Sequence, residues 1–304
     1  MGIFDSIFSR KKDDKVIETP IGYIKNGMEF FKENSPFNFL SDSLLFYSNN
    51  IKEQIKYINT HKIRSIKINN SKGDFNNLDF LAEIKHIEGV AILQDNLDLD
   101  PVYNLKNLKR LNCATITTDF DLSKFPELRI LGITYNKFVH NISSCKNLSW
   151  LWIDKFKQDN LSDLILLTNL TNLNLHQTSI IDLGGIEHLN KLTVVNIDLA
   201  KQLTSLHGLS KNNSSLEVFS VYNAPKLNDY HSLENLSNLK KLFFGKTGEI
   251  ENLDFIRNMS KLEQISIGMK VTDGNMSNLT NIKNVGFIDY PHYNLKMKDF
   301  PTVS

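Results

Sequence analysis

One six-residue unit, Leu-x-x-Leu-x-Leu, recurs eleven times along this chain at intervals of 20 to 24 residues. The pattern is clean at Leu170, Leu173 and Leu175, and related apolar residues fill the same places elsewhere. A fixed period of this length indicates a solenoid, in which each repeat stacks on its neighbours and the core grows without a size limit. The first positions of the eleven units are Ile63, Ile87, Leu108, Leu128, Leu148, Leu170, Leu192, Leu216, Leu239, Leu262 and Ile282.

The second half of each repeat has its own spacing. Apolar residues return at every third place, as in Leu161, Leu164 and Leu167. This spacing fits 3-10 turns, in which residues i and i+3 lie above one another. We therefore expect the turns to form the convex side and the x-Leu-x-Leu-x segments to form short parallel strands on the concave side.

These residues resemble the leucine-rich repeat superfamily, and in particular its class of about 22 residues per repeat, found in bacterial internalins and phosphatase-regulatory repeat proteins. The resemblance implies an α/β solenoid: a horseshoe with a concave parallel sheet and convex 3-10 or short helical turns, capped at both ends. It also implies a role in binding other proteins. One feature departs from the family, which places asparagine at the ninth position. Here that position holds Asn136 once, and otherwise Ile116, Phe156, Thr178, Ala200, Ala224 and Tyr290, so we expect less uniform turns.

Four segments follow from the extent of the repeat. Residues 1–20 read as a flexible or amphipathic tail, and the aromatic-rich residues 21–62 as an N-terminal cap with a helix from Ile51 to Asn59. The solenoid spans residues 63–288. Residues 289–304, with Tyr290, Tyr293 and Phe300, are expected to close the other end.

Composition limits the compartment and the partner. The net charge of +1 argues against a nucleic-acid partner, and no apolar run reaches the roughly 20 residues that span a bilayer. We see no secretory signal, and Cys113 and Cys145 fall on inward repeat positions as free thiols. These features favour the cytoplasm. The Asn-x-Ser/Thr triplets at Asn147, Asn169, Asn235 and Asn278 are then read as a by-product of asparagine-rich repeats.

The first residues leave three readings open. Met1, Gly2 and Ser6 fit a myristoylation pattern. Without a lipid, apolar side chains on one face of a short helix followed by Lys11 and Lys12 would allow weak peripheral membrane contact. The third reading is a disordered start, or one packed on the cap.

Strand side chains alternate, so the residues between the apolar ones must face solvent. Both tryptophans of the chain fall on such positions of one repeat, and large exposed aromatics dominate binding energies at interfaces. The alternative is that they only cover the sheet. The predicted protein-binding residues are Tyr135, Trp150, Trp152, Asp154, His176, Asp198, Tyr222 and Phe243.

The sequence offers no catalytic or metal-binding pattern. Its eight histidines are scattered, without metal-ligand spacing. His176 is expected to lie beside Asp154 and Asp198, but no nucleophile accompanies this group. Gly245, Lys246 and Thr247 resemble the end of a phosphate loop whose upstream glycine is missing. We expect no enzyme activity, no cofactor and no metal.

The sequence thus predicts a non-enzymatic, monomeric, cytoplasmic scaffold that holds a protein on its concave sheet. The asparagine- and lysine-rich composition favours a bacterial source. The partner is a toxin, which would make the chain an antitoxin or immunity protein, or a signalling protein served by an adaptor. The alternatives are an internalin-like surface adhesin or virulence factor exported without a recognisable signal, and a repeat-bearing enzyme such as a ubiquitin ligase, for which the segments outside the repeats are too short.

Overall fold

The computed structural model describes residues 16–32, 42–113 and 115–301. The predicted lipid or membrane contact of the first residues lies outside this part of the chain. The chain divides into two compact units, residues 1–110 and residues 111–304. Each unit is described by itself.

The first unit begins with an antiparallel meander and continues into parallel repeat strands. Its strand order is β1-β2-β3-β4-β5-β6, and pairing changes from antiparallel to parallel at β4. β1 starts at Val16, inside the range that the sequence assigned to a tail. The elements are β1 (Val16–Thr19), β2 (Gly22–Lys25), β3 (Met28–Phe31), β4 (Ser43–Phe46), η1 (Ser48–Asn50), α1 (Ile51–His61), β5 (Ser65–Ile68), η2 (Asp79–Glu83), β6 (Gly89–Ile92) and η3 (Asp100–Asn104).

The predicted helix of the cap is present as α1, and one face of this helix is buried. Ile55 and Ile58 are buried, as is Gln54. The Gln54 side chain donates to the Leu45 carbonyl at 2.9 Å and accepts from the Tyr47 amide at 2.9 Å. A buried amide is tolerated only with such partners. Gln54 therefore ties the helix to the end of β4.

The prediction that every position between the apolar residues faces solvent is wrong in this unit. Ser65, Gly89, Ala91 and Arg110 all lie on such positions and are buried. The Arg110 guanidinium donates to the Ser43 hydroxyl at 2.6 Å and to the Ser65 hydroxyl at 2.5 Å. The Arg110 side chain lies over both serines, so its guanidinium, and not water, is the partner of their hydroxyl groups.

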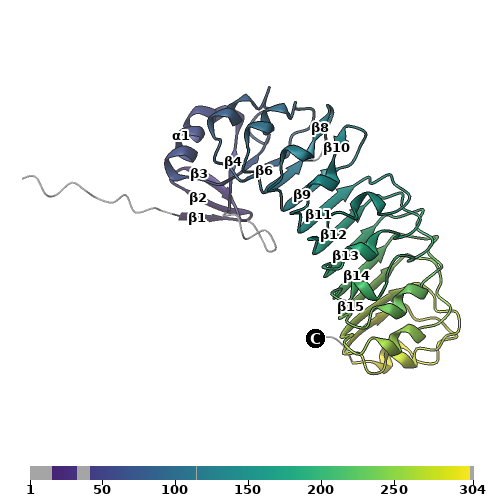
Figure 1. Ribbon diagram of the computed structural model, residues 1–304. Coiled ribbons are helices and arrows are strands. Elements are labelled where there is room, and N and C mark those ends of the chain that lie inside the picture. Colours follow the sequence, from purple (N-terminus) through teal and green to yellow (C-terminus); the bar gives the residue numbers. More distant parts are fainter. Residues whose placement is uncertain (1–15, 33–41, 114, 302–304) are drawn as a thin grey trace, which may run out of the picture. The chain divides into compact units, whose positions relative to one another are not determined.

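The second unit is a stack of parallel strands in register. In Figure 1 they run side by side along the inner side of its arc, in the order β7-β9-β11-β12-β13-β14-β15-β16-β17. β8 and β10 form a separate parallel pair. The strands are β7 (Arg110–Cys113), β8 (Phe120–Asp121), β9 (Ile130–Thr134), β10 (Val139–His140), β11 (Trp150–Asp154), β12 (Asn172–His176), β13 (Val194–Asp198), β14 (Val218–Tyr222), β15 (Lys241–Gly245), β16 (Gln264–Gly268) and β17 (Asn284–Phe287).

The predicted 3-10 turns occupy the other half of each repeat. The amides of Leu164, Leu167 and Leu170 each donate to the carbonyl three residues earlier at 2.9 Å. These leucines are fully buried. The turns are η4 (Leu122–Lys124), η5 (Ile142–Ser144), η6 (Ser162–Leu164), η7 (Ile186–His188), η8 (Lys211–Asn213), η9 (His231–Asn235), η10 (Asp254–Asn258), η11 (Ser277–Leu279) and η12 (Met297–Asp299).

The turns after the strands are alike in five successive repeats, although none of the five has asparagine at the ninth position. In five successive repeats the eighth residue is left-handed, at φ between 51° and 58°. Each of the first four donates its amide to the last strand residue of the next repeat, as Lys155 does to His176 at 2.9 Å and Gln177 to Asp198 at 3.0 Å. Backbone hydrogen bonds thus do the work expected of side chains. The five residues are Lys155, Gln177, Leu199, Asn223 and Lys246.

Asparagines join the repeats at another place. Asn147 donates to the Pro126 carbonyl and Asn169 to the Lys146 carbonyl, both at 2.9 Å. Asn235 and Asn278 do the same with carbonyls of their preceding repeats. All four asparagines begin Asn-x-Ser/Thr triplets, of which the chain has others. They are structural residues rather than a by-product of composition.

The end of the second unit is closed by aromatic side chains. Phe287 packs edge-on against Phe300 with ring centroids 5.5 Å apart. The Tyr293 hydroxyl accepts a hydrogen bond from the Val271 amide at 2.8 Å, and Tyr293 is buried. The last repeat is therefore covered, as a terminal repeat must be.

Adjacent leucines in the turn after η6 provide a matched test of the repeat core. Leu167 is fully buried, whereas Leu166 is 51% exposed. We expect Leu167→Ala to lower the free energy of unfolding by about 2–5 kcal/mol because it leaves a cavity. Leu166→Ala should change it by less than about 0.5 kcal/mol. Urea unfolding followed by circular dichroism measures both, and equal effects would contradict the assigned repeat register.

The two cysteines point inward, as predicted, and both are free and buried. Burial raises the pKa of the Cys113 thiol to about 12. Burial, together with the charge of Asp121, raises the pKa of the Cys145 thiol to about 12. Each thiol is therefore protonated at neutral pH in the folded chain.

We expect a disulfide reagent at pH 8 to modify the folded protein at least about a hundred times more slowly than the unfolded protein, because only the thiolate reacts. The rate should rise as the pH approaches 12. The same reagent in concentrated guanidinium serves as the control. Rapid labelling of the native chain at pH 8 would show that these positions are open to solvent.

Candidate functional site

The outward positions of β11 carry the two tryptophans. Trp150 and Trp152 are both partly exposed, and Leu151 and Ile153 between them are fully buried. Strand alternation alone produces this arrangement once the leucines occupy the core. The sequence prediction placed both rings on this face, and the structure has them there.

His176 occupies the centre of a polar row across three strands. The parallel register sets it between Asp154 on β11 and Asp198 on β13. Its Nδ1 atom lies 2.8 Å from Asp154 Oδ1, and its Nε2 atom lies 3.9 Å from Asp198 Oδ2. The Trp152 ring stacks beside the imidazole, with centroids 6.2 Å apart and planes 19° apart. These four side chains form one connected group.

The two carboxylates of this row are held by the chain itself. Asp154 is buried and bonded to His176. Asp198 Oδ1 accepts from the Leu199 amide and from Asn223 Nδ2, each at 2.8 Å. Both imidazole nitrogens of His176 face carboxylates, so neither is placed to accept a proton from a nucleophile. This arrangement fixes side chains in place and does not resemble a catalytic triad.

The row beside it contains a hydrogen-bonded chain that the sequence prediction missed. Asn196 Nδ2 donates to Asn174 Oδ1 at 2.8 Å, and the Ser220 hydroxyl donates to Asn196 Oδ1 at 2.6 Å. Small polar residues at the same motif position of three successive repeats are the signal for it. These two bonds hold the three side chains in place beside the flanking aromatic rings.

The remaining predicted residues lie around this centre, and among the described residues their side chains form no hydrogen bond with it, although the Tyr135 amide donates to the Asp154 carbonyl at 2.7 Å. Tyr222 is the register neighbour of Asp198 and is 40% exposed. Its ring covers Gly245, where an added Cβ would lie 2.5 Å from a ring carbon. Phe243 is partly exposed and is the register neighbour of Ser220. Tyr135 instead packs edge-on against the buried Phe156, 5.2 Å between centroids.

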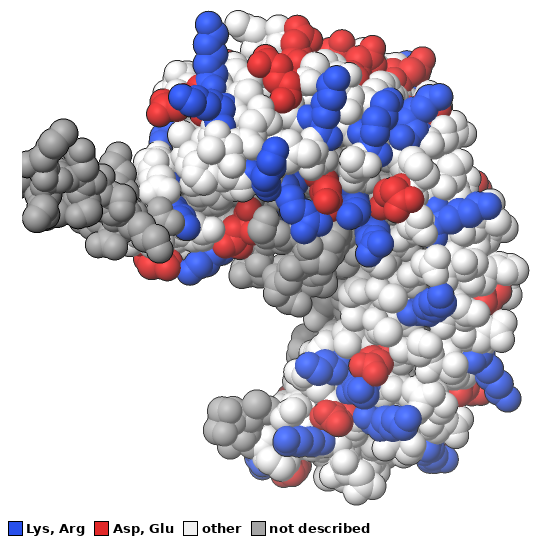
Figure 2. Space-filling view, turned by 60° about the vertical axis from the view of Figure 1, so that its left-hand side comes forward, with Lys and Arg blue, Asp and Glu red and all other residues white. Residues whose placement is uncertain are grey.

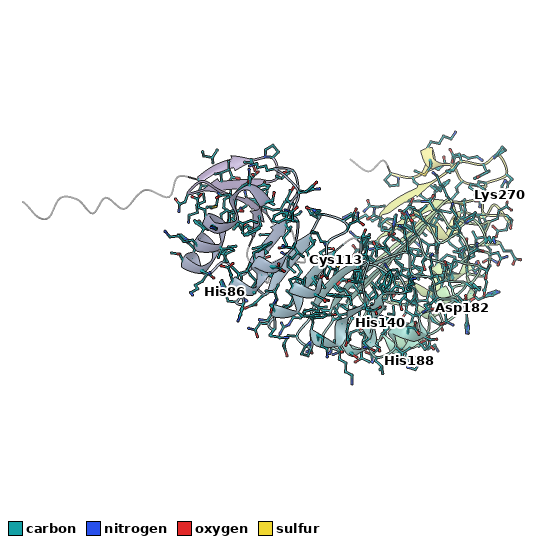
Figure 3. All side chains as sticks on the ribbon, turned by 90° about the horizontal axis from the view of Figure 1, so that it is seen from above. His86, Cys113, His140, Asp182, His188 and Lys270 are labelled. Atoms are coloured by element: carbon teal, nitrogen blue, oxygen red, sulfur yellow. The ribbon has the colours of Figure 1, made fainter. Side chains whose placement is uncertain are left out.

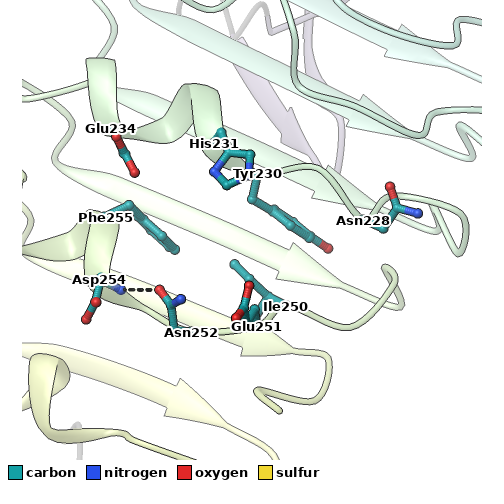
Figure 4. A pocket seen from close by; sticks show the side chains of 9 residues that line it. All are labelled: Asn228, Tyr230, His231, Glu234, Ile250, Glu251, Asn252, Asp254 and Phe255. Carbon is teal, nitrogen blue, oxygen red and sulfur yellow. Dashed lines mark hydrogen bonds between the residues drawn. The ribbon is translucent and has the colours of Figure 1, made fainter. Parts of the chain in front are cut away.

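A hollow of about 230 Å³ lies elsewhere, between η9 and η10 (Figure 4). Asp254 pairs with Arg257 at 2.9 Å, and its amide donates to Asn252 Oδ1 at 3.0 Å. Burial raises the pKa of Tyr230 to about 12, and its hydroxyl donates to the Gly248 carbonyl at 2.8 Å. The polar groups of the hollow thus stabilise the turns around it.

The scattered histidines and the phosphate-loop-like triplet lie in different repeats. His140 ends β10 and His188 ends η7, and both side chains are exposed (Figure 3). Thr247, at the end of the phosphate-loop-like triplet, is bonded to the Tyr230 hydroxyl in the turn after β15. Within residues 16–32, 42–113 and 115–301, no group of three His, Cys, Asp or Glu residues is placed to hold a metal ion. Over the same residues, no helix has the length and apolar character needed to cross a membrane.

Solved structures resemble this one in fold. An internalin of Listeria monocytogenes matches with a TM-score of 0.59 and 20% identity, covering 78% of this chain and 73% of that one. The chain has the leucine-rich repeat fold. Internalin C2 of the same species matches with a TM-score of 0.46 and 20% identity, over 79% of this chain and 91% of that one. A leucine-rich repeat protein of Leptospira interrogans matches with a TM-score of 0.38 and 14% identity, over 80% and 88%.

Comparison of sequences does not assign the chain to any family within the leucine-rich repeat fold. No protein-family model matches the chain, and no curated protein matches it. The repeat is thus recognised through its spacing and its structure.

A substitution at Trp152 can show whether this side chain contributes to binding or to folding. We expect Trp152→Ala to weaken partner binding by at least about 2 kcal/mol, because large aromatics at interface centres carry much of the binding energy. The urea midpoint should stay close to that of the wild type. Leu151→Ala, at the buried neighbouring position, should instead lower the midpoint. Calorimetric titration with the partner measures the first effect, and unchanged affinity would assign Trp152 to covering the sheet.

Proposed function

We propose that this chain is a non-enzymatic scaffold that binds a protein partner on the concave face of its second unit. The observation that carries the proposal is the pair of partly exposed tryptophans on β11. A monomeric domain that needed only to cover its sheet would use smaller polar side chains, as β12 and β13 do with Asn172, Asn174 and Asn196. Indole rings give large contact area at a small cost in side-chain entropy.

The row next to the tryptophans supports this proposal because it is already ordered. Asp154, His176 and Asp198 are fixed by hydrogen bonds and by the parallel register. A partner therefore meets a surface whose side chains need little further ordering, and ordering costs subtract from affinity. Tyr222 extends the same row with an exposed phenol.

In its more specific form, the proposal places a monomeric chain in the cytoplasm. There it holds a toxin, as an antitoxin or immunity protein would, or a signalling protein, as an adaptor would. The buried, protonated thiols of Cys113 and Cys145 are compatible with a reducing compartment. The fold is equally compatible with the alternative of an exported, internalin-like adhesin, because one fold serves many functions.

The aromatic photo-crosslinking amino acid benzoylphenylalanine at Trp152 tests the binding face directly and keeps a large aromatic side chain at this position. We expect irradiation of cells that express this variant to join the chain to one protein species, because the partner covers this ring. The same amino acid at Leu166, which is exposed on the outer turns, is the control. Mass spectrometry identifies the adduct.

Adducts of equal yield from both positions, or none from Trp152, would refute concave-face binding. The neighbouring genes then distinguish a toxin-binding protein from an adaptor. A toxin gene next to this one predicts that the crosslinked species is that toxin. Crosslinks obtained only on a cell surface would favour the adhesin.

A further inference from the structure

Lysines gather along one edge of the solenoid. The turn after each strand occupies the eighth to eleventh positions of the motif. In the second unit these positions carry six exposed lysines, one or two in each of five repeats. They lie at the carboxyl ends of the strands, next to the row that holds Asp154 and His176. The six are Lys137, Lys155, Lys157, Lys201, Lys226 and Lys246.

The charge of these lysines is not neutralised by carboxylates of the same edge. In repeats four to nine, the only acidic residue at the eighth to eleventh positions is Glu249, and it pairs with Lys270 at 3.4 Å. Among the described residues, none of the six lysines forms an ion pair, and two of them contact neutral groups. Lys226 donates to Gln202 Oε1 at 2.7 Å, and Lys137 lies 4.9 Å from the Phe138 ring centroid.

The opposite edge has a different charge pattern. At the second motif position, before each strand, the charged residues of the second unit alternate in sign: Arg129, Glu217, Lys240, Glu263 and Lys283. Lys240 and Glu217 pair at 2.9 Å. On the face turned to the reader, Figure 2 shows side chains of both signs with uncharged surface between them. The single-sign row is therefore a local feature of one edge, in a chain whose net charge is only +1.

The aspartates of the adjoining row are held by the chain itself and form no ion pair with these lysines. Asp154 is bonded to His176, and Asp198 accepts two hydrogen bonds from Leu199 and Asn223. Neighbouring strands lie ~4.8 Å apart, so the lysines from β11 to β15 span about 20 Å along the edge. A row of like charges that form no ion pairs attracts a partner of opposite sign and sets its orientation.

We propose that the partner presents an acidic polypeptide segment to this lysine edge while its apolar side chains meet Trp150 and Trp152. A protein fits better than a nucleic acid because the row contains lysine and no arginine, the residue preferred for paired contacts with phosphate. The inference rests on the proposed function, since it names the chemistry of the partner at that same face.

Poly-L-glutamate of about 20 residues, labelled with fluorescein, is the probe for this edge. The edge variant is Lys155→Gln/Lys157→Gln/Lys201→Gln/Lys226→Gln. The matched control, Lys146→Gln/Lys211→Gln/Lys261→Gln/Lys283→Gln, removes four exposed lysines from other parts of the repeats and has the same net charge. Because all eight side chains are exposed, both variants should keep the wild-type circular dichroism spectrum.

Fluorescence anisotropy at low ionic strength should show binding to the wild-type chain. Affinity should fall about tenfold or more in the edge variant and less than about twofold in the control. It should also fall as salt is added, because exposed charges are screened. No binding to the wild type, or equal losses in the two variants, would overturn the inference.

Two further probes distinguish other occupants. An oligothymidylate of 20 nucleotides or vesicles with 30% phosphatidylserine should bind more weakly than poly-L-glutamate at equal charge. Tighter binding of either would replace the acidic polypeptide with a nucleic acid or a membrane. If the protein crosslinked from Trp152 binds with the same affinity at high salt and to the edge variant, this inference is refuted and the proposed function is not. If no crosslink forms from Trp152 but poly-L-glutamate still binds to the lysine edge, the proposed function is refuted and the chemistry of the edge is not.

Discussion

Every property of the second unit depends on the parallel in-register stacking of one strand upon the next. Each strand gives its amides and carbonyls to neighbours one repeat away, and the same leucine positions meet in a common core. A parallel ladder of this kind leaves no register choice, because a slip of one residue would turn all its leucines outward. The side chains between the leucines are then held in straight rows across the sheet. Anything the protein binds on that face meets rows, not isolated residues.

The central row shows how this constraint produces an ordered surface. His176 stands between two aspartates only because three repeats place their seventh residues side by side. The neighbouring row of Asn174, Asn196 and Ser220 forms by the same rule. Polar networks that satisfy their own members are rigid and leave no group in need of a partner. Under the proposed function, the aromatic rings and the charges at the edge supply the energy of binding.

Much of this structure follows from the sequence, and the exceptions have physical causes. The period gave the strands, their outward positions and both tryptophans, because burial of leucine dominates each repeat. It did not reveal the left-handed residues after the strands, since Lys155 and Leu199 carry no local signal for a positive φ. It also missed the burial of Ser65 and Arg110, which depends on a hydrogen bond between distant repeats. The predicted residue Tyr135 sits beside Phe156 because ring packing in the turn competes with exposure.

The asparagines that connect repeats have a practical consequence for making this protein. Asn147 and Asn169 use their side-chain nitrogens to donate to the preceding repeat, and the same nitrogen is the atom that an N-glycan modifies. Passage through a eukaryotic secretory pathway would thus put a bulky sugar at the junctions where repeats are joined. Folding and glycosylation would compete for one atom at each site. A bacterial expression host avoids this competition.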